Sequence, residues 1–296
     1  MKQIFIHADD YGNTKHISEV ICKCIDEGVL NSVSIIVNSD ALDYSLQLIK
    51  NKNIRKVLHL NITEGKQLSK QNFHYLTDNK GCFFRSWQRL FFEYYFLWNE
   101  DKRKAIKEEI KEEFKNQIIL YCQKLNTKDI NIDSHQHFHT IPFITDILIE
   151  LKNEMDIKIL NIRVPKSDFV ISISSFDDLV KYLGIPVFVF LLLNKLSNKM
   201  IKKFQKENIK HNDKFVNTLF CGDMKLKTIK KEINNAKNSN NIEILLHPGY
   251  ISEEEAKEFE ENQFKKWYLH KNRKKEKNLL LSKELQIFVN SFRYNL

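Results

Sequence analysis

The sequence has 296 residues, of which 42% are hydrophobic, and a formal net charge of +9 at pH 7. A chain of this length and composition can bury a sizeable core, which excludes an intrinsically disordered protein. The positive charge would suit a nucleic-acid-binding protein. However, the sequence has neither zinc-finger spacing nor the aromatic and basic pattern of an RNA-recognition sheet, so we expect no nucleic-acid partner.

Cysteine content and hydropathy indicate the compartment. The five cysteines are odd in number and show no paired zinc-binding spacing, as expected in a reducing cytoplasm. No basic segment leads an apolar core at the start, so we expect no signal peptide. The most apolar stretch, residues 185–193, is too short to span a membrane. This segment either packs on the fold or contacts the inner face of an anionic membrane through the lysines that follow it, Lys195, Lys199, Lys202 and Lys203.

Short β-branched or apolar runs alternate with longer amphipathic segments, which is the pattern of βα units in a parallel sheet or barrel. The predicted strands are residues 3–6, 33–37, 57–60, 130–133, 159–164, 215–220 and 242–246. The predicted helices include residues 16–27, 42–50, 103–124 and 142–152. No repeat or Pro/Gly-rich linker divides the chain, so we expect one α/β domain over residues 1–296, with insertions near 67–100 and 167–212.

Reactive side chains fall where the predicted strands end. In an α/β barrel the carboxyl ends of the strands converge on one rim, so residues far apart in sequence become neighbours there. The residues at these positions are Asp9, Asp10, His59, Asp133, His135, Arg163 and His247. This shared placement predicts one active site at the carboxyl-terminal rim.

The stretch HADDYG (residues 7–12) places two adjacent carboxylates at the end of the first strand. Each raises the cost of ionising the other unless a cation offsets the repulsion. One interpretation is that a divalent ion binds one aspartate and leaves the other free as a base. The alternative is that Asp9 or Asp10 caps the helix beginning near Lys15 and Gly12 makes the turn.

The stretch DSHQHFH (residues 133–139) carries Asp133, His135, His137 and His139 at every second position. In an extended chain these four side chains would share one face. Three imidazoles and a carboxylate on one edge are hard to explain as packing, because each needs a polar partner when buried. The pattern favours a metal site in which one residue is a direct ligand and the others hold ligands or substrate.

Three further residues have a structural interpretation beside the functional one. His59 could be a hydrogen-bonded core histidine, and His247 could be incidental to a Pro-Gly turn. Arg163 could form a surface ion pair, or could orient a carboxylate on the rim through a bidentate contact.

Five motifs, in order, resemble the YdjC-like carbohydrate deacetylase family, which includes chitooligosaccharide deacetylase. They are ADDYG (8–12), LHLNIT (58–63), IDSHQHFH (132–139), IRVP (162–165) and LHPGY (246–250). The similarity spans nearly the whole chain. It departs from the family at Asn61, where the family often carries Thr, and in the two insertions, which leaves the identity of the sugar open.

The resemblance implies a distorted TIM-like (β/α) barrel of about seven strands and hydrolysis of the N-acetyl group of an N-acetylated sugar, free, polymeric or lipid-linked. It implies one divalent metal ion held by Asp10, His59 and His135. It also implies Asp9 as general base, His247 as the histidine on the acid side, and Arg163 as the residue that steadies Asp9. Tyr11 and His137 are expected to bind or orient the substrate.

Elementary chemistry agrees with these roles. One Asp and two His leave coordination positions open for water and for an acetamide oxygen. The mixed donor set fits magnesium or zinc, and also manganese, cobalt or nickel. A barrel-type metal phosphoesterase and a non-catalytic protein that binds a membrane surface or nucleic acid are the alternatives. The sequence leaves the oligomeric state open and is compatible with a homodimer.

Overall fold

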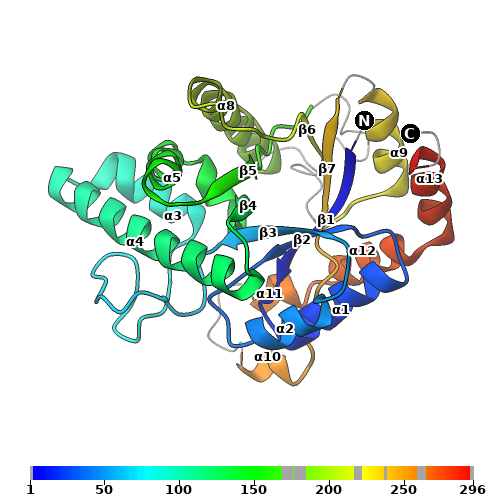
Figure 1. The fold of residues 1–296 in the computed structure, drawn as a ribbon, viewed down its shortest axis with the longest axis horizontal. Helices are drawn as coiled ribbons and strands as arrows, with labels where there is room; N and C mark the ends of the chain where they lie inside the picture. The colour runs from blue at the N-terminus through cyan, green and yellow to red at the C-terminus, as the bar shows by residue number, and fades with distance from the viewer. Residues whose placement is uncertain are drawn as a thin grey trace.

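The computed structural model describes residues 3–168, 176, 185–216, 222–236, 239–258 and 265–293. Seven parallel strands form one sheet in the order β5-β4-β3-β2-β1-β7-β6. The strands are β1 (Gln3–Tyr11), β2 (Ser32–Ile35), β3 (Arg55–Leu60), β4 (Asp129–Ser134), β5 (Lys158–Ile162), β6 (Lys214–Val216) and β7 (Asn241–Leu246). The sheet curls into a half-barrel, and its outer strands β5 and β6 do not pair with each other within the described residues (Figure 1).

This architecture confirms the predicted α/β, distorted TIM-like barrel. All seven predicted strands are present, although β1 runs to Tyr11 instead of ending at residue 6. The sixth strand occupies Lys214–Val216, and residues 217–220 of its predicted range lie outside the described residues.

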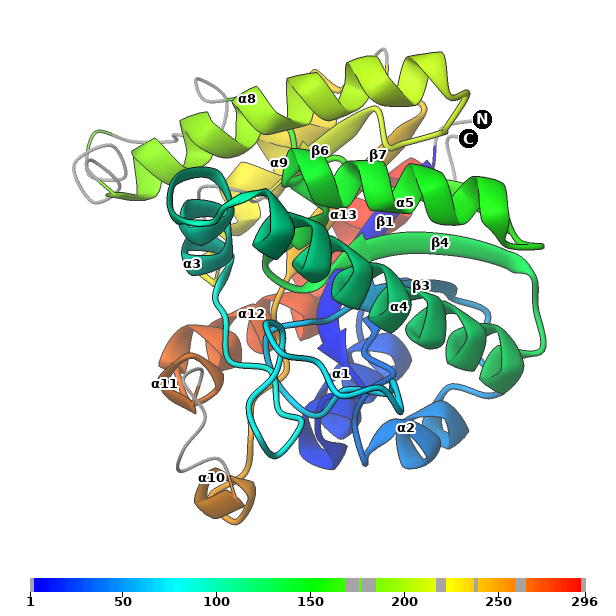
Figure 2. The ribbon, with the colours of Figure 1, turned by 90° about the vertical axis from the view of Figure 1, so that its left-hand side faces the viewer.

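Helices cover the outer face of the curled sheet (Figure 2). The helices that precede β5 are α1 (Lys15–Asp26), α2 (Leu42–Leu48), α3 (Trp87–Phe92), the π-helical η1 (Glu93–Leu97), α4 (Glu100–Leu125), the 3-10 segment η2 (His135–Thr140) and α5 (Pro142–Glu154). The later helices are α8 (Ile185–Lys206), α9 (Leu226–Asn235), α10 (Glu255–Glu258), α11 (Lys265–Tyr268), α12 (Lys271–Leu281) and α13 (Lys283–Arg293).

The turn from β1 into α1 is built by Gly12 and Thr14. Gly12 has φ +88°, and a Cβ there would lie 2.8 Å from the carbonyl oxygen of Ile36, so only glycine fits. Thr14 is the N-cap of α1, because its hydroxyl accepts a hydrogen bond from the Ile17 N–H at 3.2 Å. The interpretation that Asp9 or Asp10 caps this helix is therefore wrong, and both carboxylates are available for other work.

The segment predicted as the first insertion, residues 67–100, is irregular chain followed by α3 and η1. Two carboxylates on α4 hold the irregular part by accepting backbone N–H groups. Glu113 accepts from Leu68 and Ser69 at 3.0–3.2 Å, and Glu109 accepts from residues 74–76. The insertion is thus fixed to the barrel wall by polar contacts to one helix.

Helix α8 contains the apolar stretch of the second insertion. One face is buried and carries Phe190, Leu193, Leu196, Met200 and Phe204. The opposite face leaves Phe188 and Leu191 67% and 57% exposed. Packing on the fold is therefore shown for one side of this helix. Nowhere in the described part of the chain is a helix both long and apolar enough to cross a membrane.

Candidate active site

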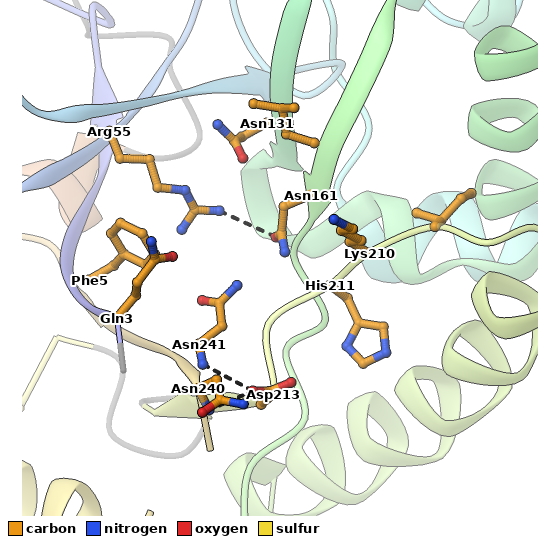
Figure 3. A pocket seen from close by; sticks show the side chains of 12 residues that line it. Gln3, Phe5, Arg55, Asn131, Asn161, Lys210, His211, Asp213, Asn240 and Asn241 are labelled. Atoms are coloured by element: carbon orange, nitrogen blue, oxygen red, sulfur yellow. Dashed lines mark hydrogen bonds between the residues drawn. The ribbon is translucent and has the colours of Figure 1, made fainter. Parts of the chain in front are cut away.

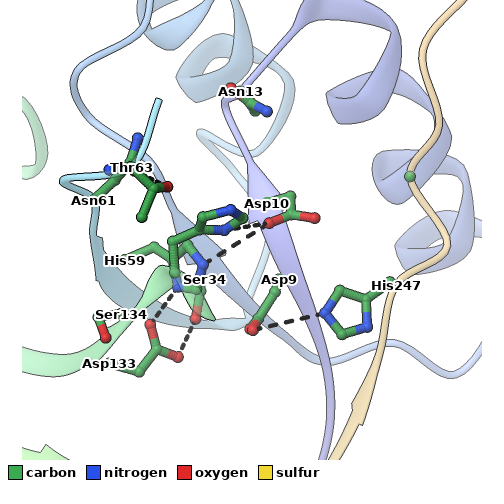
Figure 4. Close-up of polar contacts among 12 residues, drawn as sticks. Asp9, Asp10, Asn13, Ser34, His59, Asn61, Thr63, Asp133, Ser134 and His247 are labelled. Carbon is green, nitrogen blue, oxygen red and sulfur yellow. Dashed lines mark hydrogen bonds and ion pairs between the residues drawn. The ribbon is translucent and has the colours of Figure 1, made fainter. Parts of the chain in front are cut away.

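The end of β1 departs from regular strand geometry at the two adjacent carboxylates. The register of β1 against β2 shifts between Ala8 and Tyr11, and Asp10 has φ +68°. Such a conformation is uncommon for a residue other than glycine and often marks a functional site. On a regular strand, adjacent side chains point to opposite faces of the sheet. The irregularity here lets Asp9 and Asp10 both lie at the site where the strands end (Figure 4).

Asp10, His59 and His135 converge at this end of the sheet from β1, β3 and the start of η2. One ligand atom from each lies within 4.8 Å of those of the other two, and all three residues are buried. Asp10 Oδ1 is 3.9 Å from His59 Nε2 and 3.1 Å from His135 Nδ1. Within the described residues, neither Asp10 Oδ1 nor His59 Nε2 makes a hydrogen bond. Buried polar atoms without partners are costly, so this donor set fits a cation.

Two residues hold these candidate ligands from behind. Asp133 Oδ1 lies 2.6 Å from His59 Nδ1, and a carboxylate only accepts, so Nδ1 carries the proton and Nε2 presents its lone pair to the cluster. Arg273 Nη2 donates to Asp10 Oδ2 at 2.7 Å, which leaves Oδ1 facing the two histidines. Both arrangements orient a ligand atom toward one point.

The ionisation of these groups follows from burial and from their neighbours. Burial opposes the charge of Asp10, but Arg273 and His135 outweigh it and hold its pKa far below the usual value. Burial would lower the pKa of His59, but the carboxylates of Asp133 and Asp9 raise it above its ordinary value. Asp10 is therefore an anion, and a metal ion would compete with a proton on His59.

Asp9 is held by a different cation. The Arg163 guanidinium donates two hydrogen bonds to its carboxylate at 2.8 and 2.9 Å, and His7 Nε2 lies 3.1 Å from Oδ1. Burial raises the pKa of Asp9, but Arg163 and His59 lower it well below the ordinary value. Arg163 also contacts Asp133 at 2.7 Å and Glu243 at 2.5 Å, so its guanidinium is a buried hub for three carboxylates.

His7, Asp9 and Asp133 also lie close enough together to surround an ion. Their positive partner is already present, because Arg163 contacts both carboxylates. The remaining polar atoms of this group are satisfied by Ser32 and Ser34, which lie 2.7 Å from the two nitrogens of the His7 ring. This second cluster is therefore an ion-paired network rather than a vacant donor set.

His247 follows β7 and faces Asp9 across the site. Its Nε2 lies 4.0 Å from Asp9 Oδ2, and its ring packs edge-on against Trp267. Burial lowers the pKa of His247 to about 4, although Asp10 and Asp9 act in the opposite direction. The ring is therefore neutral near pH 7. Its backbone N–H is fixed by Glu276 at 2.6 Å.

Tyr11 is not at the site. The side chain is fully buried, and its hydroxyl donates to the Ser45 carbonyl at 2.6 Å, in the core between β1 and α2. The expectation that Tyr11 orients the substrate is corrected, because the irregular backbone at Asp10 changes which way the next residue points.

The expectation of one shared face for DSHQHFH is also wrong. β4 ends at Ser134, and Gln136 and His137 adopt left-handed backbone angles inside η2. His139 therefore turns to Ser134 Oγ and the Arg163 carbonyl, at 2.5 and 2.9 Å, and has a structural role. His137 stays a candidate for substrate contact, since it is partly exposed and its buried Nδ1 has no hydrogen bond within the described residues.

Sequence patterns missed three residues at the site. Arg273 and Glu276 lie in a lysine-rich run on α12 that resembles a solvated helix face. Glu64 lies five residues after His59, and its Oε1 is 3.4 Å from His135 Nε2 and accepts a hydrogen bond from the Tyr268 hydroxyl. Its proximity to the HLNIT motif was the only available signal.

Comparisons with known proteins agree with this geometry. A profile of the family described as "YdjC-like protein" matches residues 3–291. A carbohydrate deacetylase of Clostridium beijerinckii is 24% identical, with 84% of this chain and 82% of the relative covered. A carbohydrate deacetylase of Vibrio cholerae is 26% identical, with 76% and 94% covered. A crystal structure of an Enterococcus faecalis protein, described as a candidate for cellobiose-phosphate cleavage, superposes with a TM-score of 0.68 at 17% identity over 98% of this chain and 94% of that one. This last likeness supports the fold alone.

Proposed function

Because this chain belongs to the YdjC-like protein family, we propose that it is a metal-dependent carbohydrate deacetylase that hydrolyses the acetamide of an N-acetylated sugar. The names of its relatives support a sugar substrate and deacetylation. The observation that carries metal dependence is the pair of buried ligand atoms without hydrogen bonds, Asp10 Oδ1 and His59 Nε2, beside His135.

Asp10, His59 and His135 would hold the ion, and Asp133 and Arg273 would keep the first two in position. When bound, a divalent ion at such a site supplies Lewis acidity toward a carbonyl oxygen and lowers the pKa of water. One carboxylate and two imidazoles suit zinc, and magnesium, manganese, cobalt and nickel are compatible with them.

Asp9 would accept the proton of the attacking water. Its bidentate contact with Arg163 fixes the carboxylate plane but also stabilises its charge, which makes it a weak base in the resting site. We infer that so weak a base could take the proton because the water would be acidified at this site. The pairing with Arg163 therefore lowers the proton affinity of the Asp9 carboxylate and also fixes its position.

His247 would give a proton to the leaving amine, which is a poor leaving group as an anion. Because burial keeps this ring neutral near pH 7, it must first receive a proton during the cycle. Asp9 Oδ2 lies 4.0 Å from His247 Nε2 and would supply that proton after taking it from the water. In balance, the C–N bond breaks and a C–O bond forms. One water proton reaches the amine nitrogen, and the other stays on the acetic acid, which ionises to acetate in solution.

The experiment that tests the proposal is acetate release from a panel of N-acetylated sugars and nucleotide sugars by metal-loaded protein. We expect release that chelator abolishes and a divalent ion restores. Full activity in protein shown by elemental analysis to be metal-free would contradict the mechanism. Release of phosphate but not acetate from phosphorylated sugars would favour the phosphoesterase alternative, whose sites often hold two metals.

The same proposal predicts one metal ion per chain, because Arg163 already neutralises the second acidic cluster. The cytoplasmic location, the homodimer and the membrane contact of α8 stay predictions. The membrane contact of α8 would suit a lipid-linked sugar.

A further inference from the structure

A cavity of about 800 Å³ opens at the end of the half-barrel opposite Asp9 and Asp10 (Figure 3). It is lined by the amino-terminal parts of β1, β3 and β7, by residues of β4 and β5, and by residues 209–213. It lies on the side where β5 and β6 leave the sheet open within the described residues. Its volume falls within the range of small-molecule sites.

The cavity wall is rich in amides and nearly neutral. Carboxamide side chains supply five of its twelve lining residues, namely Gln3, Asn131, Asn161, Asn240 and Asn241. Each carboxamide presents both a donor and an acceptor, which is what a hydroxyl group needs. The side chains of Asn131, Asn161 and Asn241 lie at separate points of the wall (Figure 3), so it offers carboxamide donors and acceptors on several sides.

The charges in the wall do not favour an anion. Arg55 donates to Glu243 at 2.8 Å, so its charge is already neutralised, and the guanidinium covers the Phe5 ring at 4.4 Å. The other two charged lining residues, Lys210 and Asp213, carry opposite charges. We propose that this cavity is a second binding site, for a neutral sugar of one or two rings.

A chain of buried ion pairs joins this cavity to the candidate active site. Arg55 contacts Glu243, Glu243 contacts Arg163 at 2.5 Å, and Arg163 contacts Asp9. Arg55 Nη2 also lies 3.3 Å from Asn161 Oδ1 in the cavity wall. A sugar that hydrogen-bonds Asn161 competes with Arg55, so its binding is coupled through Glu243 and Arg163 to Asp9.

Calorimetric titration with maltose tests the site, since maltose is neutral and has no acetamide to hydrolyse. We expect the unmodified protein to bind it with a Kd on the order of 1 mM. Asn131→Leu and Asn241→Leu, which leave the ion-pair chain intact, should each weaken binding about tenfold. The matched control is Asn198→Leu on the exposed face of α8, and it should bind as the unmodified protein does.

Absence of maltose binding at about 50 mM, or equal loss in Asn198→Leu, would overturn the proposal. Binding of glucose 6-phosphate and inorganic phosphate but not maltose would also overturn it, in favour of an anion site. Asp9→Asn should shift the maltose Kd by about fivefold, and an unchanged Kd would overturn the coupling.

Discussion

Asp9 and Asp10 are neighbours in sequence, yet each contacts its own arginine. Arg163 takes both oxygens of Asp9, whereas Arg273 takes only Oδ2 of Asp10. The first carboxylate is therefore saturated by its cation, and the second keeps one oxygen for the histidines. The division of labour between the two aspartates rests on this difference.

Substitution of each aspartate separates the two roles. Asp10→Ala should lose both metal and acetate release, because it removes the only carboxylate of the ligand set. Asp9→Asn should keep most of the metal and lose about 10²–10⁴-fold in rate, since Asn has nearly the same shape but cannot take a proton. Metal content and acetate release on the same preparations decide this. The roles would be reversed if Asp9→Asn emptied the site and Asp10→Ala stayed loaded.

Arg273 should act as a positioning residue. It is fully buried, donates to Asp10 and to the Gly249 carbonyl, and packs over Trp267 and Tyr268. Arg273→Gln should weaken divalent-metal affinity by about 10–100-fold, because Asp10 loses the contact that directs Oδ1. Competition with a chromogenic chelator measures this affinity directly. Lys275→Gln, on the exposed face of the same helix, is the control, and equal affinity in both variants would contradict the role.

At the scale of the elements, the contribution of a buried carboxyl group on α4 to stability depends on pH. Glu113 on α4 is fully buried, and burial raises its pKa from 4.5 to about 7 despite hydrogen bonds from Gln117 and from the insertion backbone. The folded protein thus holds this proton more tightly than the unfolded chain. The stabilisation from Glu113 is complete below about pH 4.5 and is lost as the pH rises toward about 7.

Glu113→Gln should remove this part of the pH dependence. Between about pH 4.5 and 7, the free energy of unfolding of the unmodified protein should fall relative to that of the variant by on the order of 3 kcal/mol. Urea unfolding at both pH values measures the difference. Glu108→Gln, exposed on the same helix, should follow the unmodified protein, and parallel pH profiles for all three proteins would show that Glu113 does not anchor the insertion in this way.

Helix α8 has an exposed face with an apolar part and a basic part. Phe188 and Leu191 are followed by the exposed Lys195, Lys199 and Lys202. We expect weak co-sedimentation with anionic vesicles at low salt, with each lysine contributing about 1 kcal/mol near the lipid surface. Phe188→Ser with Leu191→Ser should reduce it, whereas Ile287→Ser, exposed on α13, should not. No sedimentation of the unmodified protein would remove the membrane contact.

At the scale of the whole molecule, the candidate metal ligands tie together distant parts of the chain. Asp10, His59 and His135 are neighbours only in the folded state, so an ion that binds all three stabilises the native fold over the unfolded chain. We expect zinc or magnesium to raise the melting temperature, and Asp10→Ala to abolish the increase.

The increase should depend on pH with a defined sign. Because the pKa of His59 is raised, a proton occupies this ring at lower pH and must leave before a metal ion binds. The metal-induced rise should therefore be larger at about pH 8 than at about pH 6. A rise that is equal at both pH values would show that His59 does not bind the ion.

The sequence by itself determined the seven-stranded parallel fold and most of the rim. Parallel strands place their carboxyl ends on one edge, so residues that end strands, such as Asp10, His59 and Arg163, had to lie near one another whatever the loops do. Periodicity and the position of a residue at the end of a strand depend on the local sequence, so both can be predicted without knowledge of the packing.

Tertiary structure alone decided the contacts between residues far apart in sequence. Arg273 reaches Asp10 across the fold from a run of lysines that is indistinguishable from a solvated helix face. Tyr11 points into the core because Asp10 has left-handed backbone angles. The segment after Asp133 forms η2 because Gln136 and His137 have such angles too. Periodicity in the sequence predicts neither. Among the described residues β5 and β6 do not pair. This open edge and the cavity beside it depend on strand pairing, which sequence spacing does not specify.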